Sequence, residues 1–187
     1  MVTRLSRPCK SRLRQLYWDE KGGISVYVTT LPSPLGELYL ASDGTALTGL
    51  WIEGQKHFAA TLPAELKENP DLPVFRQTED WLRSYFAKEP LPALPPMRPA
   101  GSPFRQAVWA LLGEIPHGQT TTYGALTQQL NAMGIPAAPQ AVGGAVGHNP
   151  ISILIPCHRV LGANGSLTGY AGGLEKKKVL LELEGVL

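Results

Sequence analysis

The distribution of apolar residues in the first half of the chain predicts strands followed by a helix. Three segments show the alternation or the short apolar runs of strands: residues 24–28, 38–41 and 46–52. Asp43-Gly44 tolerates the positive φ of a tight turn and joins the last two segments as a hairpin. Apolar residues at helical spacing then predict a helix over residues 75–87. The pattern favours a small α+β unit with no catalytic feature of its own.

The second half of the chain has the pattern of helices. Ser102 and Pro103 suit the cap and the first position of a helix whose apolar positions begin at Phe104. Thr122 caps a further helix, and Pro139 opens another after a turn rich in glycine and proline. Two short helices across such a turn are a candidate helix-turn-helix, although many helical hairpins bind nothing.

A proline-rich segment separates the two halves. Residues 89–103 hold six prolines, which exclude a regular helix or a central strand and favour an extended connector. The expected fold class is α+β. Four parts are expected: a basic tail over residues 1–22, an α/β domain over 23–88, a linker over 89–101 and a second domain over 102–187.

Composition narrows the classes of protein. Of the 187 residues 43% are hydrophobic, yet no apolar run approaches the roughly 20 residues that span a bilayer, so we expect no membrane contact. The scarcity of cysteine favours a reducing, intracellular compartment, and we expect a monomer that is cytoplasmic or associated with the nucleoid. Only Cys9 and Cys157 are present, which leaves a disulfide framework or a four-ligand zinc site unsupported, and we expect no metal and no cofactor. The net charge of +2 is a weak footprint for DNA binding. The basic head suits a solvated tail, a nucleic-acid arm or a transit peptide.

The helix that Pro139 opens contains two interior glycines, Gly143 and Gly144. Each interior glycine costs about 1 kcal/mol relative to alanine, so the pair costs roughly 2 kcal/mol of helix propensity. The thin surface that results suits either close packing against a neighbouring helix or insertion into a narrow nucleic-acid groove. The pattern leaves both interpretations open.

The segment Ile155-Pro156-Cys157-His158-Arg159-Val160 is the strongest candidate for chemistry. We expect residues 151–155 to form a short apolar strand that places Cys157 at its end. A buried cysteine is often inert, but His158 could serve, through a bend or a bridging water, as the base that activates the thiol. Glu184 falls between leucines on the last predicted helix, so it is either the partner of His158 or an exposed residue on a frayed terminal turn.

A glycine-rich loop over residues 165–173 follows and suits the wall of a pocket for a flat ligand. Two other thiol chemistries fail on the sequence. A Cys-x5-Arg phosphatase needs an arginine where Ala163 stands, and a papain-like hydrolase needs a distant histidine in a supporting motif, which none of the remaining histidines has. The remaining interpretation is a sulfur that attacks a flat substrate beside a groove-binding helix.

These features together resemble the O6-alkylguanine-DNA alkyltransferases, also called methylated-DNA-protein-cysteine methyltransferases. The matching segments, in order, are Ala141-Val142-Gly143-Gly144-Ala145, Asn149-Pro150-Ile151, Ile155 to Val160, Gly169-Tyr170-Ala171-Gly172-Gly173 and Glu184-Gly185. The resemblance implies an RNase H-like N-terminal domain and a mainly helical C-terminal domain whose helix-turn-helix enters the minor groove of double-stranded DNA. It also implies base flipping and irreversible, single-turnover transfer of the alkyl group of O6-alkylguanine, or of O4-alkylthymine, to Cys157.

The resemblance further implies roles for single residues. His158 and Glu184 are the implied base and its orienter. Asn149 is implied to tie the helix pair to the active-site strand, and Tyr123 to donate a hydrogen bond toward the extruded base. The implied DNA-binding and base-binding residues are Gln140, Ala141, Val142, Gly143, Gly144, Arg159, Tyr170, Ala171 and Gly172. Gln140 departs from the family pattern, because well-known members have an arginine there that fills the gap left by the base.

Two functions of other classes compete with alkyl transfer. A non-catalytic protein that binds and flags alkylation damage would share the fold but replace the nucleophile, so the presence of Cys157 counts against it. A DNA-binding regulator that uses cysteine alkylation as a signal would need an effector domain or a cluster of metal-binding cysteines. Neither is visible in the sequence.

Overall fold

The computed structural model describes residues 25–62 and 66–187, so the predicted basic tail over 1–22 lies outside the described residues. The main strands are β1 (Val26–Ser33), β2 (Gly36–Ser42), β3 (Leu47–Ile52) and β4 (Leu66–Glu68). The helices are α2 (Pro73–Ala87), α3 (Pro103–Gly113), α4 (Tyr123–Ala132), α5 (Pro139–Gly147) and α6 (Leu174–Leu183). A sheet followed by a mainly helical half is the α+β class that the sequence predicts.

The N-terminal half is a four-stranded sheet in the order β3-β2-β1-β4. The first three strands are antiparallel, and the short β4, which the apolar pattern did not predict, is parallel to β1. The predicted hairpin between β2 and β3 is confirmed. The carboxylate of Asp43 accepts hydrogen bonds from the backbone of Thr45 and Ala46, both at 2.9 Å, and Gly44 adopts a φ of 98°.

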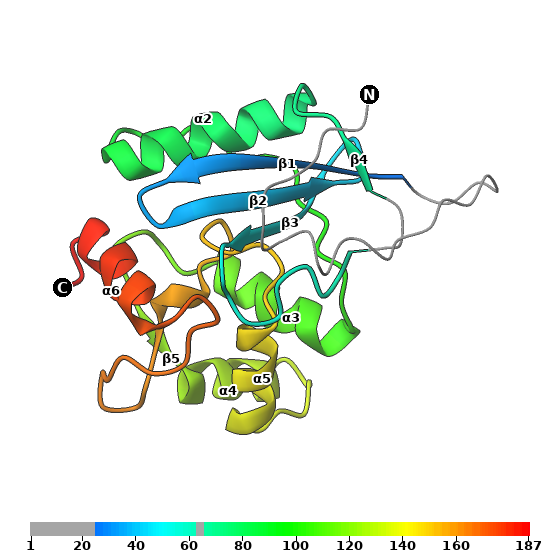
Figure 1. Cartoon of the computed structure of the whole chain (residues 1–187). Helices are drawn as coiled ribbons and strands as arrows, with labels where there is room; N and C mark the ends of the chain where they lie inside the picture. Colours follow the sequence, from blue (N-terminus) through cyan, green and yellow to red (C-terminus); the bar gives the residue numbers. More distant parts are fainter. Residues whose placement is uncertain (1–24, 63–65) are drawn as a thin grey trace.

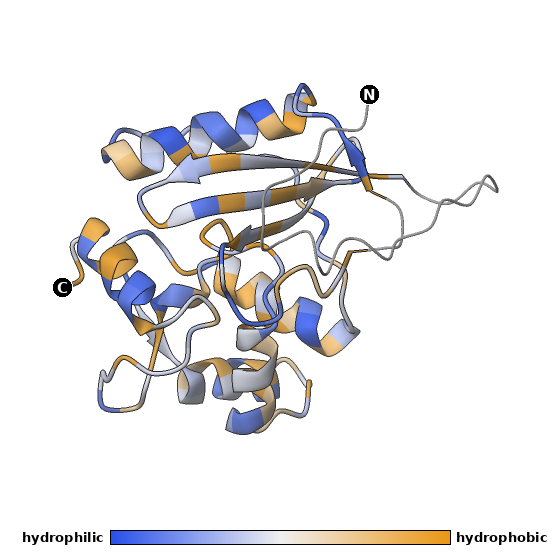
Figure 2. Ribbon diagram, viewed as in Figure 1, coloured by the Kyte–Doolittle hydropathy of each residue, from blue (hydrophilic) through white to orange (hydrophobic). Residues whose placement is uncertain are grey.

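Helix α2 lies along one face of this sheet (Figure 1). Its buried positions include Phe75, Leu82 and Tyr85, and its hydrophilic positions turn away from the sheet (Figure 2). In β2, Leu38 and Leu40 join the same core, whereas Ala41 belongs to a smaller cluster with Trp51. The alternating side chains of β2 therefore point to opposite faces of the sheet, and both faces are buried.

The edge of β3 is covered by two segments from the rest of the chain. Leu47 exchanges backbone hydrogen bonds with the 96–98 segment, and Leu50 exchanges them with the 150–152 segment, each at 2.8 Å. This pairing satisfies an edge that would otherwise expose unpaired backbone groups. The proline-rich linker and the segment that leads to Cys157 are thus both fixed against the N-terminal sheet, and one apolar core runs through both halves.

The two predicted helix caps of the C-terminal half are present. Ser102 accepts a hydrogen bond from the backbone of Arg105, and Thr122 accepts one from the backbone of Ala125. Helices α4 and α5 contact each other across the predicted turn, and the indole of Trp109 on α3 donates to the carbonyl of Ala145 on α5 at 2.9 Å. None of the helices in the described part of the chain has the length and apolar character needed to cross a membrane.

The predicted strand over residues 151–155 is wrong. Ile151 forms a single bridge with Leu50, and the chain then turns, because Ile153 adopts a φ of 71°. That conformation costs a β-branched residue of the order of 1–3 kcal/mol and persists only where the surroundings impose it. The apolar run is therefore a buried, strained loop, and Cys157 begins a 3-10 turn, η1 (Cys157–Arg159).

Candidate active site

The sulfur of Cys157 is held in the protein interior. The residue is 3% exposed, and the side-chain amide of Asn149 donates to Sγ at 3.1 Å and to the carbonyl of Ile155 at 2.7 Å. Asn149 also accepts a hydrogen bond from the backbone of Ile151, so it joins the end of α5 to the loop before the cysteine. Burial raises the pKa of the Cys157 thiol, although Asn149 and Lys177 oppose this. The resting sulfur is therefore a neutral thiol at neutral pH, not a thiolate.

His158 has one ring nitrogen engaged and one unengaged. Its Nε2 lies 2.8 Å from Oε1 of Glu184, and both side chains are fully buried. Burial lowers the pKa of His158 against the opposing effect of Glu184, so the imidazole is neutral. Since Nε2 donates to a carboxylate, Nδ1 carries the lone pair. Nδ1 is buried and has no hydrogen-bond partner in the described part of the chain, which leaves it able to accept a proton.

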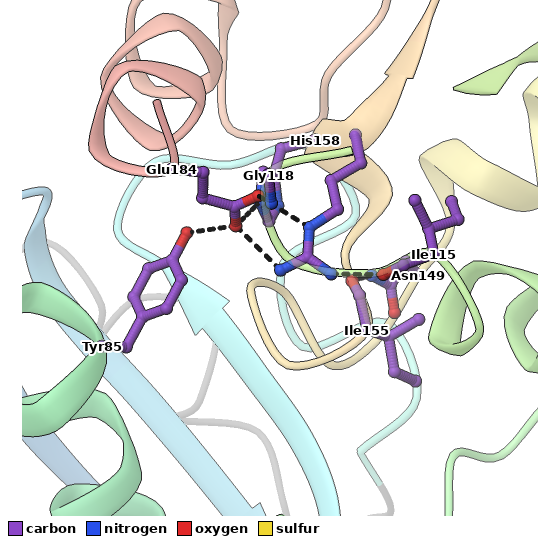
Figure 3. A network of polar contacts seen from close by, with 8 residues as sticks. Tyr85, Ile115, Gly118, Asn149, Ile155, His158 and Glu184 are labelled. Carbon is purple, nitrogen blue, oxygen red and sulfur yellow. Dashed lines mark hydrogen bonds and ion pairs between the residues drawn. The ribbon is translucent and has the colours of Figure 1, made fainter. Parts of the chain in front are cut away.

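The carboxylate of Glu184 is the centre of the polar network in Figure 3. Arg159 donates to it with Nε at 2.8 Å and with Nη2 at 2.9 Å, the backbone of Gly118 donates at 3.3 Å, and the hydroxyl of Tyr85 donates at 2.7 Å. Burial alone would raise the pKa of Glu184, but the hydrogen bonds from His158 and Arg159 outweigh it and hold the pKa well below its usual range. Glu184 is a buried anion and does not lie on a frayed end.

The predicted DNA contact of Arg159 is not supported. The residue is 7% exposed, and its guanidinium is used by Glu184 and by the carbonyl of Ile115. A charge that is buried and paired in this way cannot reach a phosphate without leaving an uncompensated carboxylate inside the protein. Arg159 instead fixes the plane of Glu184.

The glycine-rich loop is closed over two aromatic side chains. The hydroxyl of Tyr123 donates to the carbonyl of Gly169 at 3.1 Å, so its predicted bond to a base requires it to turn from this carbonyl. The hydroxyl of Tyr170 is buried and has no partner among the described residues. A Cβ at Gly172 would lie 2.7 Å from the ring of Tyr170, and one at Gly169 would lie 2.8 Å from the hydroxyl of Tyr123. Larger residues would therefore push these rings out of place.

Helix α5 presents part of its predicted binding surface. Gln140, Ala141 and Gly144 are exposed, and a Cβ added at Gly144 would meet nothing within 4 Å. Close packing against a neighbouring helix therefore does not explain this glycine. Gly143 is half-buried behind Tyr123. Val142 is fully buried and belongs to the core, so its side chain does not form part of this exposed surface.

Two residues at the site were missed from the sequence. Lys177 on α6 is fully buried and donates to the carbonyls of Val160 and Thr168 at 2.5 and 2.7 Å, and burial lowers its pKa to about 8. Its position three residues before Leu180, on the apolar stripe of the helix, was an available signal. Tyr85 gave no such signal, because its partner lies 99 residues away. Within residues 25–62 and 66–187, no group of three or more potential ligands could hold a metal ion.

Comparison with known proteins matches both halves of the chain. Residues 26–94 match the ribonuclease-like domain of 6-O-methylguanine DNA methyltransferase, and residues 103–186 match its DNA-binding domain. A methylated-DNA-protein-cysteine methyltransferase of Haemophilus influenzae is 44% identical over 163 residues, covering 87% of this chain and 88% of the relative. One of Methanosarcina acetivorans is 42% identical and covers 86% and 99%.

Solved structures agree with these matches. The crystal structure of Mycobacterium tuberculosis OGT in complex with DNA is 41% identical with a TM-score of 0.74, covering 86% of this chain and 92% of that one. An O6-methylguanine DNA methyltransferase of Methanococcus jannaschii is 28% identical with a TM-score of 0.60, covering 85% and 94%.

Proposed function

Because the chain belongs to the 6-O-methylguanine DNA methyltransferase family, we propose that Cys157 is the residue that accepts the alkyl group. The protein repairs DNA by direct transfer of the alkyl group of O6-alkylguanine to one of its own cysteines. The observation that carries the choice of Cys157 is its hydrogen bond from Asn149 at 3.1 Å, beside a neutral histidine whose free nitrogen is buried.

The proposed reaction is a displacement at carbon. The sulfur of Cys157 attacks the alkyl carbon, the S–C bond forms, and the bond between that carbon and O6 breaks with its electron pair left on guanine. The thiol proton passes to Nδ1 of His158 through a bridging water, while Glu184 stabilises the imidazolium that results. Guanine takes up one proton from the hydroxyl of Tyr123, and the proton held by His158 returns to Tyr123 through water, so the net reaction moves the thiol proton to guanine.

Formation of the thiolate is coupled to the arrival of the substrate. The resting thiol is neutral because its burial disfavours the charged form. Neutral His158 can take the proton, and the positive charges of Lys177 and Arg159 lie in the same interior. We therefore place ionisation of the sulfur in the transfer step and not in the free protein.

The proposed DNA complex uses the exposed side of α5. The alkylated base must leave the stack, since in-line attack on its alkyl carbon is blocked within a duplex. Gln140, at the N-terminal end of α5, is exposed and uncharged, and we assign to it the filling of the gap by hydrogen bonding. The bound form is a monomer on double-stranded DNA that contains O6-alkylguanine. Because its substrate is cellular DNA, we propose that the protein acts where that DNA lies, and we expect this compartment to be the cytoplasm.

The test is the mass of the intact protein after incubation with duplex DNA that carries O6-methylguanine. The expected result is a gain of one methylene on the peptide that contains Cys157, with none in Cys157→Ser. Methylation of the Cys9 peptide would contradict the assignment of the acceptor. Tight binding to the lesion without any covalent change would favour a protein that flags damage.

A further inference from the structure

The carboxylate of Glu184 receives one of its hydrogen bonds from the N-terminal half of the chain. Tyr85, near the C-terminal end of α2, donates its hydroxyl to Oε1 at 2.7 Å (Figure 3). We propose that Tyr85 is a positioning residue for alkyl transfer, acting on Cys157 through Glu184 and His158. The inference rests on the proposed role of Cys157 and gives the N-terminal domain an indirect part in the chemistry.

The position of the Tyr85 hydroxyl is fixed by aromatic packing. Tyr85 is 1% exposed, and Trp81 stacks on its ring with the centroids 5.2 Å apart and the planes 12° apart. Phe86 and His117 meet the ring edge-on, at 5.4 and 6.0 Å. Because the ring is held on several sides, its hydroxyl cannot follow Glu184 if the carboxylate moves. It therefore acts as a rigid donor that α2 delivers to one point.

The hydroxyl shares its acceptor with the catalytic histidine. Oε1 of Glu184 accepts from Tyr85 at 2.7 Å, from His158 at 2.8 Å and from Arg159 at 2.9 Å. Each donor draws charge from the oxygen, so each weakens the hold of that oxygen on the other donors. Burial and the neighbouring carboxylate raise the pKa of Tyr85, which therefore remains protonated and a donor at neutral pH.

The effect of Tyr85 falls on the basicity of His158 more than on the orientation of Glu184. The two-point contact from Arg159 already fixes the plane of the carboxylate. Loss of the Tyr85 hydroxyl concentrates negative charge on Oε1 and stabilises the imidazolium form of His158. A histidine that is already protonated cannot accept the thiol proton. The other charged groups that face His158, namely Arg159 and Lys177, are unchanged by a substitution at position 85.

The substitution Tyr85→Phe in the full-length protein tests this role, because it removes the hydroxyl and keeps the ring. Single-turnover transfer would be measured across pH with O6-methylguanine duplex, together with the titration of His158 by NMR. We expect the acid limb of the rate profile and the His158 titration to move to higher pH. With each rate divided by the plateau rate of the same protein, transfer by Tyr85→Phe on the acid limb should be slower than transfer by the unmodified protein by a factor of roughly three. This factor corresponds to part of the free energy of one charge-assisted hydrogen bond.

Tyr39→Phe is the matched control. Tyr39 also donates to a carboxylate oxygen, Oε2 of Glu37, at 2.7 Å, but in the N-terminal sheet. The Tyr39→Phe substitution should leave the acid limb of the rate profile and the His158 titration at the same pH as in the unmodified protein. A Tyr85→Phe variant with a lower melting temperature but an unmoved limb and an unmoved His158 titration would show a purely structural role and overturn the inference.

A second substitution covers the case in which Tyr85→Phe does not fold. Incorporation of 3-fluorotyrosine at position 85 makes the phenol a stronger donor without deleting it, so the limb should move in the opposite direction, to lower pH. No movement overturns the inference. Failure of the unmodified protein to transfer the methyl group would instead count against the role of Cys157, while the His158 titration would continue to report on Tyr85 separately.

Discussion

The side-chain amide of Asn149 donates a hydrogen bond to the sulfur of Cys157 over 3.1 Å and lowers the pKa of a thiol that burial raises. Asn149→Ala removes this donor, so the thiol pKa should rise further. Hydrogen bonds to charged groups contribute about 1.5–3 kcal/mol, which predicts at least about tenfold slower alkylation of Cys157 at neutral pH. The measurement is the pH dependence of the reaction with a small neutral electrophile.

Asn69→Ala is the control for the Asn149 prediction. Asn69 accepts a hydrogen bond from the backbone of Asp71 at an exposed turn of the N-terminal half. It should leave the reactivity of Cys157 unchanged. Equal reactivity in the Asn149 variant would remove the amide from any role in activating the sulfur.

Glu184 gives folding stability a definite dependence on pH. Its pKa is depressed in the folded state, so its contribution is present above the unfolded value of about 4.3 and is lost as pH falls toward the folded value. The difference in the free energy of unfolding between the wild type and Glu184→Gln should be constant near neutrality and shrink below about pH 4.3. Urea titrations at several pH values measure it, and a difference that grows in acid would contradict the assignment.

The same substitution should be costly at neutral pH because it leaves the guanidinium of Arg159 buried without its anion. Breaking a buried ion pair from one side costs about 3–5 kcal/mol. The double variant Arg159→Met, Glu184→Gln removes both charges and should recover much of this loss in denaturant titrations. Recovery of stability without recovery of alkyl transfer would separate the two roles of Glu184.

Gly144→Ala should stabilise the fold and weaken DNA binding. An added Cβ meets nothing within 4 Å, so the helix gains about 1 kcal/mol of propensity without a clash. On the bound side, the methyl group would stand between α5 and the DNA. Gly113→Ala, on α3, also meets no neighbour and should stabilise without changing DNA affinity. Thermal melts and duplex binding of both variants decide the matter. Unaltered DNA affinity in Gly144→Ala would contradict the proposed binding side of α5.

Lys177 should add stability as pH rises. Burial lowers its pKa to about 8, so between that value and the unfolded value of about 10.4 the unfolded chain binds more protons than the folded one. Relative to Lys177→Met, the wild type should gain up to about 3 kcal/mol of unfolding free energy across this window. Lys178→Met, at the neighbouring exposed position, should show no such gain. A flat difference for Lys177→Met would mean that the amine is not desolvated as described.

Local patterns predicted the helices well, because the signals that start a helix lie within a few residues of it. Ser102 and Thr122 cap as expected, and Pro139 opens α5. The strand prediction for the apolar run before Cys157 was wrong because a buried strand at a sheet edge and a buried loop have the same apolar composition. In the structure, the positive φ of Ile153 and the single bridge of Ile151 distinguish the loop from a strand.

The site was predicted where motif residues are adjacent and missed where partners are distant. His158 and Glu184 meet as expected, but the resemblance implied a DNA-binding role for Arg159, which the structure buries. The burial of Arg159 depends on its partner Glu184, which lies 25 residues later in the chain. The contact of Tyr85 depends on α2, which brings its hydroxyl to the same carboxylate. Contacts of this kind arise from tertiary packing and leave no periodic trace in the sequence.

The shelter of Cys157 has a chemical consequence for the lifetime of the protein. Hydrophilic oxidants and small electrophiles in the surrounding water meet a residue that is only 3% exposed and whose burial favours the uncharged thiol. Such a thiol reacts slowly with them, because the thiolate is the reactive species. A protein that is consumed by its first reaction thereby keeps its sulfur for the damaged base.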